Sequence, residues 1–298
     1  TITPAGIVED DNFGANYSVT FVPVSTGTIN KASLIAQADN KKIFVTRPDP
    51  IFTVTYTGLK GTDTGADIDT KPTCAVTVNP HTAVGTYPIA CSGAVDNNYN
   101  ITSYLNGILT VAPPTFQDVP ATYWAWEYVE RVYAAGITGG CTSNPLNYCP
   151  GNSVTRAQMA IFLLRAEHGS NYAPPAATGM FSDVALTDFA APYIEQLARE
   201  GITGGCATGK YCPGNPVTRA QMAIFLLRAE HGYTYTPPAA VGMFTDVPLT
   251  DFAAPFIEQL ANEQITGGCA AGKYCPGNSV TRDQMAIFLT RTFKLPDL

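Results

Sequence analysis

Charged side chains are scarce in this chain. Lys, Arg, Asp and Glu make up 14% of its 298 residues, against about 25% in typical soluble proteins. Neutral polar side chains must therefore cover most of the surface, as suits proteins that pack against other proteins or against sugars. The net charge is −7 and the pI is near 4.9. Nucleic acid is not expected as a partner, because binding phosphates needs a basic patch and none is visible.

Long apolar runs and catalytic residue sets are missing as well. No apolar run approaches the roughly 20 residues that span a bilayer, so we expect no transmembrane segment. The first residues lack the basic end and apolar core of a signal peptide, which indicates a mature chain or a fragment. Of only three histidines, His168 and His231 follow helical stretches, where a cation suits the helix dipole. The sequence therefore predicts no catalytic residues, no metal site and no cofactor.

One sequence block is repeated three times in the C-terminal two-thirds of the chain. Each copy contains Phe-x-Asp-Val, Ile-Thr-Gly-Gly-Cys, Tyr-Cys-Pro-Gly-Asn and Val-Thr-Arg-x-Gln-Met-Ala-Ile-Phe-Leu. The threonines of the last motif, Thr155, Thr218 and Thr281, are 63 residues apart. A fixed period indicates a supersecondary unit that cannot bury its apolar face alone, so we expect one module built from all copies. The copies are expected at residues 114–169, 179–232 and 242–298.

The eight cysteines indicate the redox environment. Six fall in pairs, one pair in each copy of the repeat, and two lie nearer the N-terminus. An even count with short paired spacing favours four disulfides and an oxidising compartment. Zinc is the alternative, but it needs four ligands at one site and no histidine repeats beside these pairs. The expected disulfides are Cys74 with Cys91, Cys141 with Cys149, Cys206 with Cys212, and Cys269 with Cys275.

The region before the repeats has the pattern of strands. Residues 33–113 alternate apolar and polar positions, and residues 51–56 and 101–111 are the clearest strands. Short strands with no helical period favour an all-β sandwich of the Ig-like type. Residues 16–21 and 27–30 repeat the pattern of its last strands, so residues 1–32 resemble the tail of another β domain. These strands must complete an upstream domain, pack on their neighbour, or pair with another copy by strand addition.

Each copy of the repeat is expected to fold as helix, loop, helix. The first helices are expected at residues 123–135, 189–200 and 252–263. Thr-x-x-Gln opens each second helix as a capping box, in which threonine and glutamine satisfy each other's backbone N–H groups. The expected cap pairs are Thr155 with Gln158, Thr218 with Gln221, and Thr281 with Gln284. The apolar residues that follow cover nearly all sides of the helix, which predicts interior helices at the core of a pseudo-threefold bundle.

An arginine follows the capping threonine in every copy, at Arg156, Arg219 and Arg282. A cation at a helix N-terminus is mildly unfavourable, so its threefold occurrence calls for a reason. One reason is an anion site, made by the helix end and a guanidinium that grips carboxylate or phosphate. The other is structural, with each arginine paired to an acid of a neighbouring copy. The candidate acids for the second reading are Asp118, Asp183 and Asp246.

The repeats resemble S-layer homology domains. The matching features are Phe-x-Asp-Val, the aromatic before the first helix, the Gly-Ile-x-x-Gly loop, and Thr-Arg-Ala-Gln in place of Thr-Arg-Ala-Glu, over residues 116–293. The resemblance implies a pseudo-trimer with grooves between its lobes. It also implies binding to an anionic cell-envelope polysaccharide, with Arg156, Arg219 and Arg282 lining the grooves. Glutamine replaces the motif acid in all copies, Asp283 replaces an alanine, and Trp124 is matched by Phe189 and Phe252.

The β region resembles the MBG domain, an Ig-like module of bacterial surface proteins. The features that carry this resemblance are Phe-Val-Thr-Arg-Pro-Asp-Pro-Ile-Phe at residues 44–52, Thr-Gly-Leu at 57–59, Val-Gly-Thr-Tyr at 84–87 and Leu-Thr-Val at 109–111.

The sequence thus predicts a multidomain chain, with an N-terminal all-β Ig-like sandwich followed by a mainly α, pseudo-threefold module of three repeats. The predicted function is noncatalytic: an extracellular protein of the bacterial cell surface that binds envelope polysaccharide and displays the β domain. The alternative is a structural subunit of a filament or array, in which residues 1–32 of one copy pair with the next copy.

Overall fold

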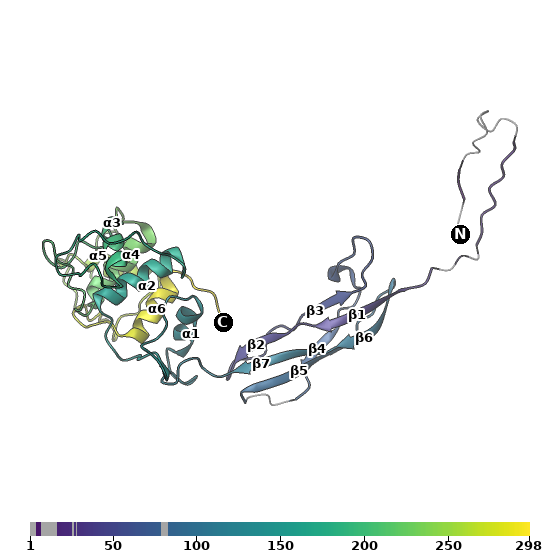
Figure 1. The fold of residues 1–298 in the computed structure, drawn as a ribbon, viewed down its shortest axis with the longest axis horizontal. Helices are drawn as coiled ribbons and strands as arrows, with labels where there is room; N and C mark the ends of the chain where they lie inside the picture. Colours follow the sequence, from purple (N-terminus) through teal and green to yellow (C-terminus); the bar gives the residue numbers. More distant parts are fainter. Residues whose placement is uncertain (1–3, 7–16, 26, 28, 79–82) are drawn as a thin grey trace. The chain divides into compact units, whose positions relative to one another are not determined.

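A computed structural model of the protein describes residues 4–6, 17–25, 27, 29–78 and 83–298. The chain divides into two compact units, residues 1–112 and 113–298. Strands form the first unit and helices dominate the second (Figure 1). Within the described residues, every helix is too short or too polar to cross a membrane.

The first unit contains two β-sheets. One has the strand order β3-β1-β6 and the other β2-β7-β5-β4. The pairs β1/β6 and β2/β7 are parallel, and the other neighbours are antiparallel. The strands are β1 (Ala32–Ala38), β2 (Lys41–Phe44), β3 (Val54–Thr57), β4 (Thr73–Val76), β5 (Gly85–Ser92), β6 (Tyr99–Leu105) and β7 (Gly107–Ala112), with a short 3-10 helix η1 (Gly65–Asp67) after β3.

The two sheets share an apolar core. Ala38 of β1, Ile89 of β5 and Leu109 of β7 are buried in one cluster. Side chains alternate between the faces of a strand, so every second residue of β7 points inward. The disulfide between Cys74 and Cys91 joins directly opposed residues of β4 and β5. The sequence prediction of a strand-rich first domain is therefore confirmed.

The strands expected near the N-terminus fall partly outside the described residues, which omit 16, 26 and 28. Residues 17–23 are described and belong to no strand. Their apolar side chains, among them Tyr17, Val19 and Phe21, are exposed. Of the predicted strand at 16–21, the described part is therefore an exposed segment with no assigned sheet partner.

The second unit is built from alternating first and second helices of the repeats. Each first helix begins two or three residues later than the sequence predicted, because a turn precedes it; in the first copy Trp126 N–H donates to the Tyr123 carbonyl at 2.9 Å. The first helices are α1 (Trp126–Ala134), α3 (Ala191–Arg199) and α5 (Ala254–Asn262), and the second helices are α2 (Arg156–His168), α4 (Arg219–His231) and α6 (Arg282–Thr292). Two short strands, β8 (Thr142–Ser143) and β9 (Leu146–Asn147), form a hairpin in the first copy.

The capping boxes agree with the sequence in two helices and differ in the third. Thr155 with Gln158 and Thr218 with Gln221 form complete boxes, which confirms those predictions. The predicted box of Thr281 and Gln284 is wrong, because the Thr281 hydroxyl donates to Asp283 instead.

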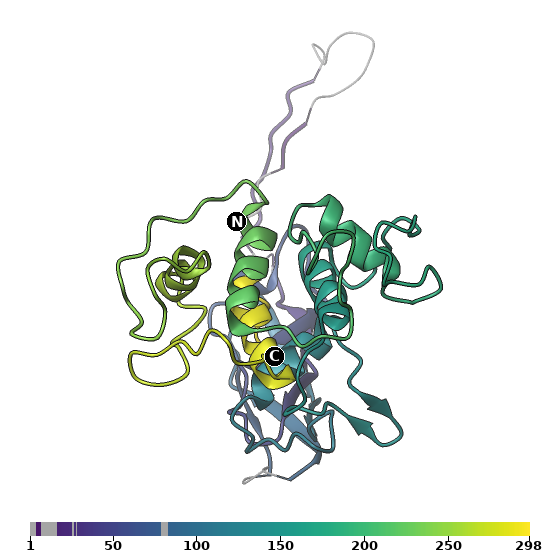
Figure 2. The same ribbon diagram turned by 90° about the vertical axis from the view of Figure 1, so that its left-hand side faces the viewer.

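Hydrogen bonds between repeats connect the three copies in a closed circle. Val217 N–H donates to the Val154 carbonyl, Val280 to Val217, and Val154 to Val280, each at 2.9 Å. Each second helix also packs against the first helix of another copy, in the pairs α2/α3, α4/α5 and α6/α1. In Figure 2, α4 lies near the middle of this unit, with α3 and α5 toward its outer edges. The second helices are buried on nearly all sides, as the sequence predicted.

All four disulfides expected from the cysteine spacing are present. Those of the repeats join Cys141 to Cys149, Cys206 to Cys212, and Cys269 to Cys275. Each closes the loop that joins the two helices of its copy. No described cysteine is free.

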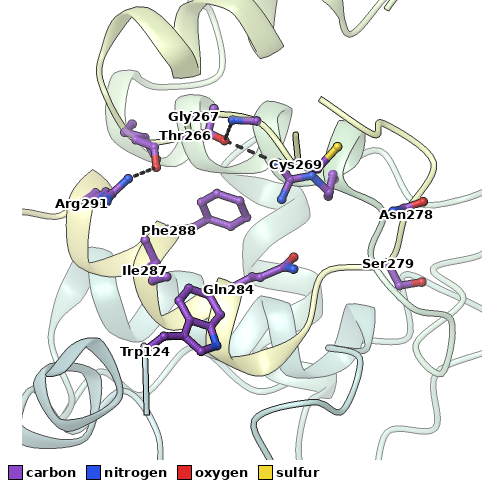
Figure 3. Close-up of a pocket in the computed structure, with 13 residues that line it drawn as sticks. Trp124, Thr266, Gly267, Cys269, Asn278, Ser279, Gln284, Ile287, Phe288 and Arg291 are labelled. Carbon is purple, nitrogen blue, oxygen red and sulfur yellow. Dashed lines mark hydrogen bonds between the residues drawn. The ribbon is translucent and has the colours of Figure 1, made fainter. Parts of the chain in front are cut away.

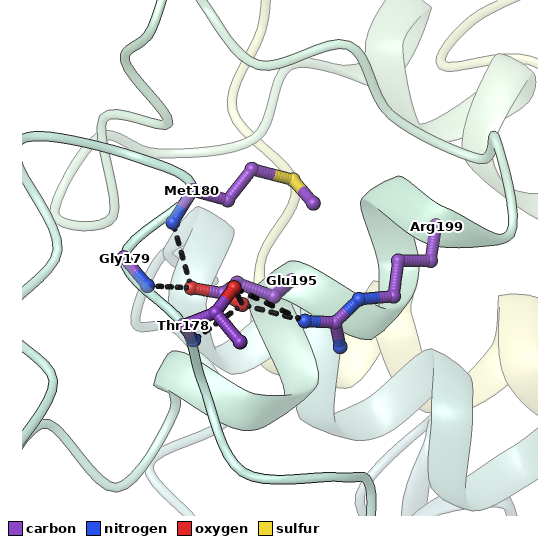
Figure 4. A network of polar contacts seen from close by, with 5 residues as sticks. All are labelled: Thr178, Gly179, Met180, Glu195 and Arg199. Carbon is purple, nitrogen blue, oxygen red and sulfur yellow. Dashed lines mark hydrogen bonds and ion pairs between the residues drawn. The ribbon is translucent and has the colours of Figure 1, made fainter.

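A buried glutamate fastens each interrepeat linker to the following first helix. Glu195 of α3, 2% exposed, accepts hydrogen bonds from the backbone N–H groups of Thr178, Gly179 and Met180 at 2.7–2.9 Å, and from Arg199 at 2.8 Å (Figure 4). Burial raises the pKa of the Glu195 carboxyl, but the hydrogen bonds to it have the larger combined effect and lower that pKa to about 2. Glu258 holds the next linker in the same way.

We expect Glu195→Gln to destabilise the protein by about 2–4 kcal/mol at neutral pH, because an amide cannot replace a carboxylate that accepts several N–H bonds. The folded-state pKa lies below the ordinary value of 4.5, so this contribution is complete above that pH. It is lost as the pH falls through about 2, and the variant and the wild type should converge there.

Urea unfolding between pH 7 and pH 2 measures this difference. Asp297→Asn is the matched control, because the Asp297 side chain is 82% exposed. A difference between Glu195→Gln and the wild type that stays constant over this range would contradict the prediction.

Candidate functional site

A cavity of about 350 Å³ lies beside α6, and we call it the Trp124 groove. Its walls are residues 265–269 and one face of α6 from the third copy, Arg219 from the second copy, and Trp124 from the first. Figure 3 shows Trp124, Gln284, Phe288 and Arg291 around this space. All three copies contribute to one groove, so a single repeat cannot form it.

A second cavity, of about 200 Å³, has the corresponding position beside α2, and we call it the Phe189 groove. Residues 137–140 and the α2 side chains come from the first copy, Phe189 and Tyr193 from the second, and Arg282 from the third. We call each boundary between two copies a seam. At the remaining seam the equivalent residues include Arg156 and Phe252.

The three arginines predicted as ligand-binding residues are buried, at 3–4% exposure. Arg219 Nε donates to the Tyr274 carbonyl at 2.8 Å, and Nη2 lies 3.5 Å from Thr266 Oγ1. Its guanidinium carbon is 4.7 Å from the centre of the Tyr274 ring. Arg156 and Arg282 make the same three contacts with the next copy. Burial lowers the pKa of each guanidinium, but arginine remains charged at neutral pH.

Acidic side chains do not form ion pairs with these arginines in the described part of the chain. The expected partners serve another purpose: Asp118 accepts the backbone N–H groups of Tyr148 and Cys149 at 2.7 Å. Asp183 and Asp246 make the equivalent pairs of bonds in their own copies. These carboxylates hold a turn in which the second cysteine has a positive φ of 56–59°. The alternative of arginine–aspartate ion pairs is therefore wrong.

The helix N-termini do not face open space. Arg156 N–H donates to the Asn215 carbonyl at 2.9 Å, and Ala157 N–H donates to the Pro213 carbonyl at 3.0 Å. The other second helices are closed by the next copy in the same way. An anion in the grooves would therefore meet guanidinium groups rather than free helix N–H groups.

Exposed aromatic side chains mark the outer edge of the seams. Trp124 is 62% exposed, and Phe189 and Phe252 are each 77% exposed. They occupy the same position in the three copies, so their exposure is systematic. Trp126, two residues after Trp124, is buried.

Sequence reasoning missed a second set of arginines, near the end of each second helix. Arg291 lines the Trp124 groove and Arg165 lines the Phe189 groove. The guanidinium carbon of Arg291 is 5.7 Å from the ring centre of Tyr128, and that of Arg165 is 5.9 Å from Tyr193. Each groove therefore has two arginines and no carboxylate in its lining. The signal in the sequence was an arginine nine residues after the motif arginine in every copy.

The Gly-Gly pair of each repeat forms the loop wall of its groove. Gly268 has a φ of 90°, and a β-carbon there would lie 2.3 Å from the Lys273 carbonyl oxygen. Gly205 and Gly140 are in the same position. Only glycine permits this close approach of the loop to the following turn.

The described residues include four clusters of side chains with metal-ligating atoms. Glu167, His168 and Glu200 place ligand atoms within 4.8 Å of one another, and Glu230, His231 and Glu263 repeat the arrangement. His168 Nε2 is 3.0 Å from a Glu200 oxygen of the next copy, so this pair joins two repeats. Clusters that include Cys206, Cys212, Cys269 or Cys275 cannot offer thiolates, because these residues are in disulfides.

Two family models match the chain. The S-layer homology domain matches residues 115–160, 181–223 and 244–286, and the MBG domain (YGX type) matches residues 34–110. Both matches lie where the sequence resemblance placed them.

Relatives align over more than half of the chain. The chain is 28% identical to an amylopullulanase from Thermoanaerobacterium thermosulfurigenes, over 72% of this chain and 11% of the relative. It is 24% identical to an S-layer protein from Bacillus thuringiensis subsp. finitimus, over 62% of this chain and 22% of the relative. It is 26% identical to cell surface glycoprotein 1 from Acetivibrio thermocellus, over 62% of this chain and 8% of the relative. The chain therefore spans only a small part of the length of these relatives.

The repeated motifs, the three-copy helical unit and the strand-rich first unit agree with these two matches. The chain is therefore an S-layer homology domain protein, with an MBG domain in front of its three S-layer homology repeats.

Proposed function

We propose that the helical unit is a pseudo-threefold, noncatalytic module that binds an anionic polysaccharide of the bacterial cell envelope and so anchors the MBG domain at the extracellular surface. The closed circle of bonds between the copies supports the pseudo-threefold arrangement. The S-layer homology domains and the S-layer relatives support a role in cell-surface anchoring. The name of the amylopullulanase describes that much longer relative, and its alignment with this chain covers 11% of it.

The observation that carries this proposal is the charge of the grooves. Two arginines and no carboxylate line each groove, although the chain has a net charge of −7. The hydrogen-bond partners of Arg219 and Arg282 are carbonyls and hydroxyls, and each guanidinium also contacts a ring. Asp246 and Asp118 act on these two guanidinium groups through space, without forming an ion pair with them in the described part of the chain. A partly buried positive charge at a cavity wall attracts an anion more strongly than an exposed one, because water screens it less.

The exposed aromatic rings at the mouths of the grooves are suited to bind the sugar part of the proposed ligand. Trp124 and Phe189 present apolar ring faces at the mouths of cationic grooves. Such a face packs against the C–H face of a sugar ring, while arginine grips a carboxylate or phosphate on the same chain. A polymer carrying both groups therefore matches the groove better than a small inorganic anion does.

The motif arginines are poor test positions, because they also hold the copies together. Truncating Arg219 would remove buried contacts with Tyr274 and Thr266 and cost stability, whatever the ligand. Trp124 and Arg291 are exposed, so they are better test positions. Arg291 still donates to the Ile265 carbonyl at 3.2 Å, so the stability of its variant has to be measured beside its binding.

We expect the full chain to sediment with purified cell envelopes, and Trp124→Ala to weaken this retention at least tenfold. Arg291→Ala should weaken it severalfold and reduce its sensitivity to added NaCl, since one screened ion pair is lost. Cosedimentation at 50–500 mM NaCl measures both effects.

Tyr233→Ala is the control, because Tyr233 is an exposed aromatic between the second and third copies. Circular dichroism verifies that each variant is folded. Folded Trp124→Ala and Arg291→Ala variants that are retained as well as the wild type would contradict the proposed groove.

A second candidate function is assembly of copies by strand addition. It is favoured by the exposed apolar residues at positions 17–24, where Tyr17, Val19 and Phe21 alternate with Ser18 and Thr20 as in a strand. A strand with one apolar face is suited to pair with an exposed sheet edge.

Deleting residues 1–30 separates the two functions. If assembly uses this segment, the deletion should abolish high-mass species in light scattering and leave cosedimentation with envelopes unchanged. Identical light scattering before and after the deletion would exclude strand addition by these residues.

A further inference from the structure

The third copy differs from the others at the first turn of its second helix. Asp283 stands where the first two copies have Ala157 and Ala220. Its carboxylate is buried at 6% exposure and accepts the Tyr123 hydroxyl of the first copy at 2.5 Å. It also accepts the Thr281 hydroxyl and, at 2.7 Å, the Gln284 backbone N–H. One side chain therefore pairs an N–H group in the first turn of α6 and joins two copies.

The same substitution releases the side chain of Gln284. In α2 the Gln158 Oε1 accepts the Thr155 N–H at 3.3 Å, and the equivalent bond holds Gln221 in α4. In α6 the Gln284 Oε1 is buried and has no hydrogen-bond partner in the described part of the chain. An unpaired buried acceptor is unfavourable, so a new partner for this carboxamide would be favourable.

The released side chain lines the Trp124 groove. Figure 3 shows the Gln284 carboxamide beside Trp124 at this cavity. Rotation about its last bond exchanges the oxygen and the nitrogen, so the group can accept or donate toward a ligand. In the Phe189 groove the corresponding residue, Gln158, is held by its cap.

Tyr123, the partner of Asp283, also differs from the residues at its position in the other copies. Tyr123 occupies the position of Asp188 and Asp251, whose carboxylates accept the N–H groups of Ala190 and Ala253 at 2.8 Å. In the first copy the Tyr123 hydroxyl instead reaches α6. Tyr123 directly precedes Trp124, with ring centres 6.0 Å apart. The bond to Asp283 therefore attaches the segment that carries Trp124 to the first turn of α6, where Gln284 lies.

We infer that the Trp124 groove is the tightest ligand site of the module and that Gln284 determines its specificity. The ligand class is a sugar residue that carries an acidic group and a free hydroxyl. Trp124 covers the sugar face, Arg291 and Arg219 attract the acidic group, and the Gln284 carboxamide binds the hydroxyl. This inference rests on the proposed function, since it takes the groove to be a polysaccharide site.

Two substitutions test the role of Gln284. Gln284→Ala removes the carboxamide and should weaken retention on purified envelopes about tenfold, because a buried site built for a hydroxyl loses its partner. Asp283→Ala restores the Thr-Arg-Ala-Gln sequence of the other copies and should return Gln284 to a capping box. It should weaken retention to a similar extent with Gln284 still present. Gln158→Ala, the matched change in the Phe189 groove, should change retention less than twofold.

A spectroscopic measurement keeps the test valid if a variant folds poorly. In the wild-type chain, soluble polysaccharide released from the envelope should shift the side-chain amide NMR signals of Gln284. The corresponding signals of Gln158 and Gln221 should stay in place, because their caps hold them.

The outcomes separate this inference from the proposed function. If Gln284→Ala and Asp283→Ala bind as the wild type does while Trp124→Ala does not, the role of Gln284 is refuted and the groove stands. If Phe189→Ala abolishes retention and Trp124→Ala does not, the choice of groove is refuted while polysaccharide binding stands. If the wild-type chain does not bind the polysaccharide, both proposals are refuted.

Discussion

The helical unit depends on the bonds that the N-terminus of each second helix makes with the next copy. A helix start has unpaired N–H groups, and a buried start without partners is costly. Here the first N–H groups of α2, α4 and α6 donate to carbonyls of another copy, and the adjacent arginine reaches into the same copy. The donors of the third copy are received by the first, so the circle closes with three repeats. With one repeat fewer, a helix end and a guanidinium would be buried without their partners.

This way of burying arginine leaves its charge available. A carboxylate partner would neutralise the guanidinium, but carbonyl, hydroxyl and aromatic partners only position it. The nearby acid of each copy, such as Asp246, is occupied with two backbone N–H groups instead. The arrangement thus combines a structural role of the arginine with a positive potential in the groove. A structural role through carbonyl and ring partners, rather than through an aspartate, is therefore compatible with the proposed ligand-binding role.

Repeats that share the same sequence motifs still produce unequal grooves. The exposed aromatic is Trp124 at one seam and a phenylalanine at the other two. The substitution of alanine by Asp283 changes the cap of α6, the contact to Tyr123 and the freedom of Gln284. The shared residues build the scaffold, and a few differences at the seams distinguish the grooves from one another.

The sequence by itself determined the repeats, the strand-rich first domain, the four disulfides and the interior second helices. These features follow from spacing and from apolar pattern, which are local in the chain. The first turn of α6 could not be foreseen, because its Asp283 accepts the hydroxyl of Thr281 and also that of Tyr123, which is 160 residues away. The burial of the arginines, the closing of the helix ends and the presence of Trp124 and Arg219 in one groove likewise depend on residues of different copies. Only the tertiary structure decided these, because each groove is assembled from all three repeats.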